Sequence, residues 1–355
     1  MNRNLLLGSL AAAGSILVTL GLTELVLRTI DYPPSNFSPW IRAADTAYRY
    51  APDLDTRMRR APEYDVRFET NALGLRDDEI SETADGPRVM FIGDSFTSGF
   101  GVERGELFVD LVEADLGVDV VNAGVGGYEV IHQVQYLRER GRALAPDLVV
   151  YVLYLGNDLS RNDEWRETAD GGLEAADRVY PVRVERELKL GRLIRNLRYR
   201  AAGREAEERG AWEPFPDYLA MCALDLTDSA VKDYEASRRE LLELRDEVAA
   251  AGAELLVAVF SYRTAVDPVE RGRYESELGP RAAEHDLDRP EREILAFLAS
   301  NEIATVNLND ALRARYAGGT APLYFEIDGH FTPEGHRVTA DALLGALRPW
   351  VGRRP

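Results

Sequence analysis

Five short apolar runs alternate with amphipathic stretches along most of the chain. The runs are typical of buried strands, and the stretches repeat apolar residues every three or four positions, as helices do. We expect strands over residues 89–92, 118–121, 147–155, 254–260 and 304–308. We expect helices over residues 106–116, 127–144, 229–251, 291–299 and 333–347. This alternation predicts an α/β fold of three layers, a central parallel sheet with helices on both faces.

One uncharged apolar run, residues 5–23, stands apart from this pattern near the amino terminus. Its 19 residues come close to the roughly 20 that a helix needs to cross a bilayer. Small residues lie inside the run and not after it, unlike the end of a cleaved signal peptide. We therefore expect residues 1–28 to be a single-pass transmembrane anchor, with an amphipathic or buried helix as the alternative. Arg3 and Arg28 give little charge bias, and we expect the rest of the chain to lie outside the cytoplasm.

Two other segments lack the alternation of strands and helices. Residues 29–61 contain several prolines without clear periodicity, so we expect a linker or stalk before a main domain over residues 62–355. Residues 160–228 are rich in charge and carry scattered aromatic side chains. They are expected to be an insertion, with helical spacing over residues 184–204. The insertion can be a surface element that packs on itself or a lid beside a ligand site, and the sequence leaves both readings open.

Composition excludes several classes of function. Of the 355 residues, 45% are hydrophobic, which is enough for a sizeable core. The net charge of −19 argues against binding to nucleic acid or to anionic lipid surfaces. Cys222 is the only cysteine, which excludes an internal disulfide and a thiolate metal site. No cluster of His, Asp and Glu has the spacing of metal ligands, so we expect no metal and no other cofactor.

Polar residues suited to acyl transfer follow three consecutive expected strands. Ser95 comes directly after the first strand, Gly127 follows the second, and Asn157 follows the third. Because the carboxyl ends of parallel strands meet at one edge of the sheet, these residues should converge there. A serine hydroxyl can act as a nucleophile, while a glycine N–H and an asparagine amide can stabilise an oxyanion.

An acid and a base follow much later, in the sequence Asp-Gly-His at residues 328–330. His330 can take the proton of a serine hydroxyl, and Asp328 can hold the imidazole in the required tautomer. Each residue alone has a simpler explanation, since Ser95 could cap a helix and His330 could be a surface residue. Their joint occurrence at strand ends favours an esterase that acts through a serine.

With these residues in place, the chain resembles the SGNH (GDSL-type) hydrolases over roughly residues 70–350. The family has four sequence motifs. This chain has a segment that looks like each of them, namely Gly-Asp-Ser-Phe, Asn-Ala-Gly-Val-Gly-Gly, Gly-Asn-Asp and Asp-Gly-His. The resemblance implies a three-layer α/β/α fold, no cofactor and ester hydrolysis through an acyl-serine. It assigns the nucleophile to Ser95, the oxyanion donors to Gly127 and Asn157, and the acid and base to Asp328 and His330. Residues 71–77 also look like a segment of membrane-anchored members.

The spacing of the last motif departs from the family pattern. Most members place two residues between the acid and the histidine, so that the acid lies three positions before the histidine. In this chain Ile327 lies three positions before His330. Asp328, one residue closer, is the expected acid, and Glu326 is the alternative. The shorter spacing resembles that of polysaccharide O-acetyltransferases of related fold.

Three functions therefore stay open for the chain. They are an esterase for small O-acyl esters, an O-acyltransferase to a cell-surface polysaccharide, and a non-catalytic glycan-binding protein. The expected partners are an ester substrate, such as an acylated glycan or lipid, and the membrane through the amino-terminal helix.

Overall fold

The computed structural model describes residues 3–29, 39–43, 45–81, 84, 86–159, 165–167, 173–175, 190, 216–318 and 321–353. It divides into two compact units, residues 1–38 with 183–214 and residues 39–182 with 215–355. The expected helix over residues 184–204 lies outside the described residues, apart from Leu190.

The first unit contains helix α1 (Arg3–Thr29). Within the described part of the chain, no helix is both long enough and apolar enough to cross a membrane, so the transmembrane anchor expected over residues 1–28 is not supported. Large apolar side chains are exposed on α1, at Ile16, Leu17, Val18, Leu20, Leu22, Leu25 and Val26.

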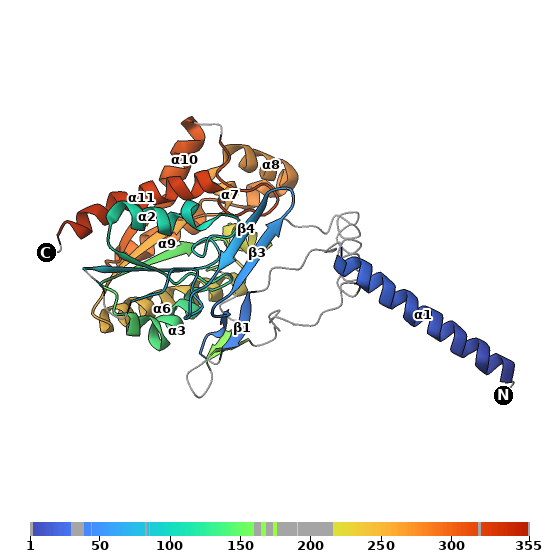
Figure 1. Cartoon of the computed structure of the whole chain (residues 1–355). Coiled ribbons are helices and arrows are strands. Elements are labelled where there is room, and N and C mark those ends of the chain that lie inside the picture. Colours follow the sequence, from blue (N-terminus) through green and yellow to red (C-terminus); the bar gives the residue numbers. More distant parts are fainter. Residues whose placement is uncertain are drawn as a thin grey trace. The chain divides into compact units, whose positions relative to one another are not determined.

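A five-stranded parallel sheet forms the centre of the second unit (Figure 1). In spatial order its strands are β11 (Ala304–Asn307), β10 (Glu254–Phe260), β7 (Leu148–Tyr154), β5 (Arg88–Gly93) and β6 (Asp119–Asn122). Every neighbouring pair runs parallel. Since β5 and β7 are buried along almost their whole length, their continuous apolar sequences match strands that are covered on both faces.

Helices cover both faces of the sheet, which confirms the expected α/β class with a central parallel sheet. Figure 1 shows α2 (Phe108–Leu116) beside α11 (Pro333–Val351) on one side, and α3 (Val130–Glu139) beside α6 (Asp228–Ala250) on the other. The other described helices of this unit are α5 (Pro216–Cys222), α7 (Arg263–Val266), α8 (Pro268–Leu278), α9 (Arg289–Ser300) and α10 (Leu308–Gly318). Short 3₁₀ turns lie at Arg104–Glu106, Gly141–Leu144 and Gly279–Glu284.

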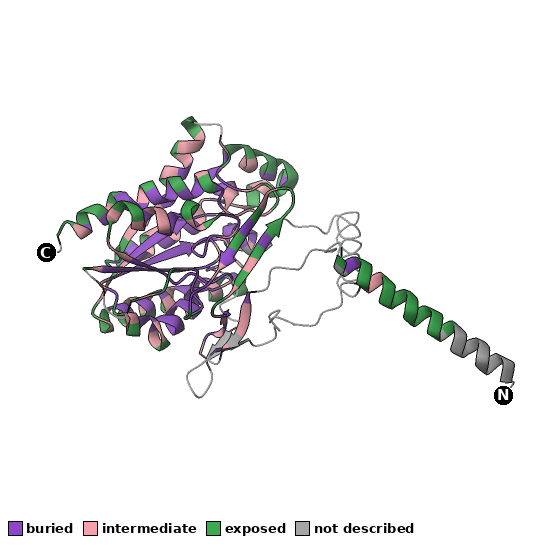
Figure 2. Ribbon diagram, viewed as in Figure 1, coloured by how far each residue is buried: buried purple, intermediate pink, exposed green. Residues whose placement is uncertain are grey.

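A hydrophobic core lies between the sheet and the α2–α11 layer. Figure 2 shows buried residues concentrated along the strands and on the sheet-facing sides of the helices. Each large apolar side chain that is fully buried stabilises the fold by roughly 1.5–3 kcal/mol. The core includes Val89, Phe91, Val150 and Val152 from the strands, Phe108 and Val112 from α2, and Leu343, Leu344 and Leu347 from α11.

Two β-hairpins precede the sheet in the sequence, where the linker was expected. Strand β1 (Trp40–Ala43) pairs with β2 (Ala47–Tyr50), and β3 (Asp55–Arg60) pairs with β4 (Tyr64–Glu69), both antiparallel. Residues 39–61 therefore belong to the same compact unit as the sheet and are not a linker. The physical reason is burial on alternate positions, with Tyr48 and Tyr50 buried and their neighbours half-buried.

A third hairpin lies within the expected insertion. Strands β8 (Trp165–Glu167) and β9 (Leu173–Ala175) pair antiparallel. The carboxyl-terminal part of the insertion is formed by α5 and the first residue of α6. The remainder of residues 160–228 lies outside the described residues, so the choice between lid and surface element stays a prediction.

Candidate active site

Ser95 lies in a tight turn directly after β5. The N–H of Ser98 donates to the carbonyl of Asp94 at 3.0 Å, and the N–H of Phe100 donates to that of Ser95 at 3.0 Å. The side chains of Asp94 and Phe96 are buried on either side, while Ser95 is half-buried. The turn therefore leaves the serine hydroxyl accessible at the carboxyl edge of the sheet, as the sequence predicts.

His330 lies against this hydroxyl. The Oγ atom of Ser95 is 2.7 Å from Nε2 of His330, although the two residues are 235 positions apart. The imidazole ring packs on Phe96 and Phe100, with ring centroids 4.7 and 5.3 Å away. These aromatic neighbours fix the ring and shield one side of it from water, so Nε2 stays directed at the hydroxyl.

Asp328 completes a chain of hydrogen bonds. Its Oδ1 atom hydrogen-bonds to Nδ1 of His330, and its Oδ2 accepts from the Tyr64 hydroxyl at 2.8 Å. Burial would raise the pKa of this carboxyl, but the hydrogen bonds from His330 and Tyr64 and the charges of His330 and Arg60 together outweigh burial and hold the pKa below its usual value. Asp328 is therefore ionised at neutral pH and can hold the imidazole with its Nε2 lone pair facing the serine. Glu326, the alternative acid, is exposed.

A narrow loop carries the acid and the base. The N–H of Phe325 donates to the carbonyl of His330 at 2.8 Å, and the N–H of Gly329 donates to that of Phe325 at 3.1 Å. Gly329 has a φ of +84°, a conformation that costs a residue with a side chain about 1 kcal/mol or more. The left-handed turn at Gly329 lets Asp328 meet the imidazole although only one residue separates them.

Asn157 follows β7 and is fixed by a buried carboxylate. Its Nδ2 donates to Oδ2 of Asp94 at 3.2 Å, and the other oxygen of Asp94 accepts from the N–H of Phe96 at 2.9 Å. Burial raises the pKa of Asp94 to about 6. Asp94 thus links the Asn157 amide to the Ser95 turn, and an amide nitrogen has a second hydrogen to offer to a developing oxyanion.

Gly127 lies in the loop between β6 and α3. This loop is bound to the end of β5, because the N–H of Val125 donates to the carbonyl of Gly93 at 3.0 Å. Gly127 has a φ of +84°, and a Cβ there would lie 2.9 Å from the hydroxyl oxygen of Tyr48. The structure therefore joins Ser95, His330 and Asp328 in one chain of hydrogen bonds. It places Gly127 and Asn157 on the loops that follow β6 and β7.

Several residues that support the site were not identified from the sequence. Tyr50 is fully buried, with its hydroxyl 2.9 Å from Ser98 Oγ, and it accepts from the N–H of Gly126 at 2.6 Å. It therefore joins the serine turn to the Gly127 loop. The only sequence signal for Tyr50 was the Tyr-x-Tyr alternation at residues 48–50.

Arg76 belongs to the segment 71–77 that the sequence singled out, and it binds the backbone that follows the Ser95 turn. Its guanidinium donates to the carbonyls of Ser98 at 2.9 Å and Val102 at 2.7 Å, and also to that of Gly99. It lies over the ring of Phe68 at 4.8 Å. Burial lowers the pKa of Arg76 to about 10, so the side chain remains charged at neutral pH and holds the chain that follows Ser95.

A hydroxyl, an imidazole and a carboxylate lie in hydrogen-bond sequence at the carboxyl edge of the parallel sheet, which is the arrangement that acyl transfer through a serine requires. The family model described as the GDSL-like Lipase/Acylhydrolase family matches residues 91–338. The chain belongs to this family and is a hydrolase that acts on ester bonds. No curated protein matches the chain.

Three solved structures illustrate the likeness of fold. TesA is 16% identical, with a TM-score of 0.40, over 74% of this chain and 98% of TesA. LAE5, an alpha/beta hydrolase enzyme from the metagenome of Lake Arreo, is 16% identical, with a TM-score of 0.42, over 75% of this chain and 96% of LAE5. A catalytic mutant of Axe2, an acetylxylan esterase from Geobacillus stearothermophilus, is 17% identical, with a TM-score of 0.39, over 74% of this chain and 95% of Axe2.

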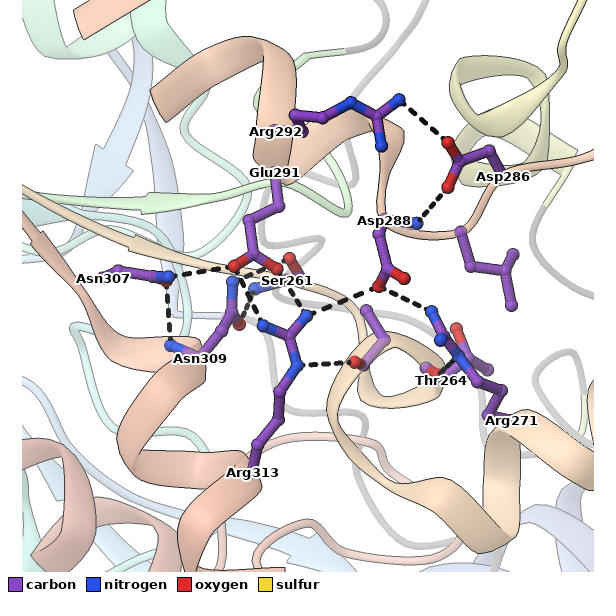
Figure 3. Close-up of polar contacts among 12 residues, drawn as sticks. Ser261, Thr264, Arg271, Asp286, Asp288, Glu291, Arg292, Asn307, Asn309 and Arg313 are labelled. Atoms are coloured by element: carbon purple, nitrogen blue, oxygen red, sulfur yellow. Dashed lines mark hydrogen bonds and ion pairs between the residues drawn. The ribbon is translucent and has the colours of Figure 1, made fainter. Parts of the chain in front are cut away.

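A second cluster of charged side chains lies at the carboxyl ends of β10 and β11 (Figure 3). The carboxylate of Glu291 accepts from Arg313 at 3.0 and 2.5 Å and from Asn307 at 2.9 Å. Asp288 accepts from Arg271 at 2.6 Å. A cavity of about 420 Å³ is lined by Arg271, Asp288, Glu291, Arg292, Leu295 and Arg313. Each charged side chain drawn in Figure 3 has a partner of opposite charge, so we assign this cluster to stability.

Replacing Arg313 with alanine should lower the free energy of unfolding by about 2–3 kcal/mol. The substitution leaves the Glu291 carboxylate, whose side chain is 9% exposed, without its charge partner, although the partial exposure of Arg313 reduces the cost. Urea unfolding measures the change. Arg348→Ala is the matched control, because its ion pair with Asp115 is on the surface and should contribute less than about 1 kcal/mol. Equal losses in the two variants would contradict the assignment.

Proposed function

We propose that the chain is a serine esterase that hydrolyses small O-acyl esters, such as acetyl groups on a glycan, through an acyl-Ser95 intermediate. The observation that carries the proposal is the run of hydrogen bonds from Ser95 through His330 to Asp328. Nucleophile, base and orienting acid are already within hydrogen-bond reach of one another, as acyl transfer requires.

In the first half of the reaction, Nε2 of His330 removes the proton of the Ser95 hydroxyl as Oγ attacks the ester carbonyl. The oxyanion receives hydrogen bonds from the Asn157 amide and from the backbone N–H groups of Gly127 and Ser95. The tetrahedral intermediate then collapses, the C–O bond to the alcohol breaks, and His330 gives its proton to the leaving oxygen. Asp328 stabilises the imidazolium that forms between these two steps.

In the second half, water enters where the alcohol left. His330 takes a proton from this water as the water oxygen attacks the acyl carbonyl. The Asn157 amide and the N–H groups of Gly127 and Ser95 donate to the second oxyanion as they did to the first. The bond from the acyl carbon to Oγ breaks, Ser95 regains its proton from His330, and the free acid leaves.

A glycan as the alcohol part of the ester is supported by aromatic side chains beside the base. The ring centroids of Phe100 and His330 are 5.3 Å apart, and those of Trp40 and Phe100 are 6.3 Å apart. Both residues are half-buried, and the Trp40 indole is held by its N–H, which donates to the carbonyl of Gly126 at 3.2 Å. Aromatic faces held beside the polar groups of the site offer an apolar surface, which suits a sugar ring.

The test uses the full chain with p-nitrophenyl acetate and with an acetylated oligosaccharide. We expect release of acetate from both, and a fluorophosphonate should add one covalent label, on Ser95, detected by mass spectrometry. Absence of both turnover and label would contradict the esterase proposal and favour a non-catalytic glycan-binding protein.

An O-acyltransferase is the second candidate, and the short Asp-Gly-His spacing favours it. A sugar hydroxyl would then replace water in the second half of the reaction. The discriminating measurement is the rate of acyl-donor consumption with and without an unacetylated oligosaccharide. Acceleration together with an acetylated oligosaccharide product would favour transfer, whereas an unchanged rate with free acetate favours hydrolysis.

We also propose that the enzyme works outside the cytoplasm and is held at the membrane by α1. The support is the uncharged run of residues 5–23 and the large apolar side chains exposed on α1. After expression of the full chain, carbonate extraction of the membranes should leave it in the pellet. Recovery of the chain in the soluble fraction before extraction would contradict the proposal.

Replacing Asn157 with alanine should lower kcat and kcat/KM together by about 10²–10³-fold, because one oxyanion donor is lost. KM should change little, since the oxyanion forms only after the substrate has bound. Steady-state kinetics with p-nitrophenyl acetate measures both constants. Asn301→Ala, which removes an amide at the end of α9, is the control, and equal kinetics in the two variants would refute the assigned role.

A further inference from the structure

The tip of the β3–β4 hairpin lies against the loop that carries the catalytic acid. Oε1 of Glu63 accepts the N–H of Ile327 at 2.7 Å, and Oε2 accepts the N–H of Asp328 at 2.9 Å. A single carboxylate thus holds two successive backbone N–H groups just before His330. The hairpin precedes residues 91–338, which match the family model, so it lies outside the matched part of the chain.

Tyr64, the next residue of the hairpin, reaches the acid itself. Its hydroxyl donates to Oδ2 of Asp328 at 2.8 Å, while Oδ1 of the same carboxylate hydrogen-bonds to His330. The ring of Tyr64 packs on Phe325, with centroids 5.1 Å apart, which fixes the direction of the hydroxyl. Burial and the charge of Asp328 raise the pKa of Tyr64 above its usual value, so the hydroxyl keeps its proton and acts as a donor.

The short spacing of the motif explains why such support matters. With one residue between acid and base, Asp328 reaches the imidazole through the left-handed turn at Gly329. Glycine has more conformational freedom than any other residue, so this turn does not by itself hold the carboxylate in one orientation. Contacts from outside the loop, at both the backbone and the second carboxylate oxygen, supply that restraint.

We propose that Tyr64 is a positioning residue for the catalytic acid, and that Glu63 and Tyr64 together fix the Asp328 carboxylate on His330. The relay then has four members in sequence, Ser95, His330, Asp328 and Tyr64. This inference rests on the proposed function, because it assigns Tyr64 a role in the reaction that Ser95 carries out.

Tyr64→Phe tests the inference, since it removes the hydroxyl and keeps the ring. We expect kcat to fall about tenfold with KM unchanged, as for loss of one hydrogen bond to a charged group. We also expect the acidic limb of the pH profile of kcat/KM to move to higher pH. A carboxylate that has lost a donor is more basic and holds the proton on His330 more strongly.

Other charged groups near the relay keep their places in this variant. Arg60 has its Nε 3.9 Å from Oδ2 of Asp328, Glu63 holds the backbone, and the buried Asp94 contributes its charge near His330. None of them is altered by Tyr64→Phe, so a shift of the acidic limb reports on the lost hydroxyl. Tyr234→Phe is the matched control, because it removes a buried hydroxyl that donates to the carbonyl of Met221 at 3.2 Å.

A double-mutant cycle separates positioning from general stability. In an Asp328→Asn background, Tyr64→Phe should have almost no further effect on kcat, because its partner is already lost. An additive tenfold loss in that background, or parental kinetics for Tyr64→Phe alone, would overturn the inference. Failure of the proposed function has a different signature, since the parent protein itself would then show neither turnover nor fluorophosphonate labelling.

Discussion

Replacing Ser95 with alanine should abolish ester hydrolysis. We expect kcat to fall by about 10⁶-fold, because nucleophile, base and acid act as a unit and the loss of the nucleophile removes the covalent route. The structure gives the reason, since Ser95 Oγ is the atom within 2.7 Å of the only imidazole in the relay. The half-buried side chain is small, so its loss should change the melting temperature little.

The measurement is p-nitrophenyl acetate cleavage by parent and variant at equal concentration, with thermal unfolding as the check on folding. Ser261→Ala is the control for loss of a serine hydroxyl. Its hydroxyl is buried and accepts from Asn309 at 3.0 Å at the end of β10. It has no bond to a member of the relay among the described residues, and its kcat should match the parent. A folded Ser95→Ala protein as fast as the parent would mean that another nucleophile acts.

The sheet was predictable because buried parallel strands have a direct sequence signal. A strand covered on both faces is a continuous apolar run, as in Leu148–Tyr154 and Glu254–Phe260. The expected strands over residues 147–155 and 254–260 therefore match the observed bounds within one residue. Helix α3 was less predictable, since the expected helix over residues 127–144 is divided into Val130–Glu139 and a 3₁₀ turn.

The hairpins before the sheet were not predictable from local pattern. Prolines at positions 33, 34, 39 and 52 indicated a linker, but the side chains that matter are buried by partners far along the chain. Tyr50 contacts the Gly127 loop 76 residues away, and Tyr64 contacts Asp328 264 residues away. Such contacts depend on tertiary packing, which no short window of sequence reports.

The catalytic motifs were easier to identify than the residues that support them. Ser95 and Asn157 each follow a strand of the parallel sheet, so their convergence at one edge could be expected. His330 stood out because an acid lies beside it in the sequence. Asp94, by contrast, could be interpreted from the sequence simply as part of the serine turn. Only the hydrogen bond that it accepts from Nδ2 of Asn157 shows that it holds the amide. The acid stayed ambiguous in the sequence because Asp328 and Glu326 both lie near His330.

Asp328→Asn should resolve that ambiguity, with kcat lowered by about 10⁴-fold. The ionised Asp328 accepts a hydrogen bond from the N–H at Nδ1 of His330, which leaves the lone pair of Nε2 free to take the proton of Ser95. An asparagine amide can donate to Nδ1 instead, which favours the tautomer with hydrogen on Nε2, and that tautomer cannot act as the base. The substitution also removes the negative charge that stabilises the imidazolium.

Glu326→Gln is the matched variant for this prediction, since it neutralises a carboxylate two residues earlier in the same loop. Its side chain is exposed, so kcat should stay at the parental value. Kinetics with p-nitrophenyl acetate across pH compare the two, with thermal unfolding to confirm that both variants are folded. If Glu326→Gln were inactive and Asp328→Asn retained activity, the acid would be Glu326, and the left-handed turn at Gly329 would have no role in catalysis. If instead Asp328→Asn alone loses activity, that turn is what allows an acid one residue away to serve the base.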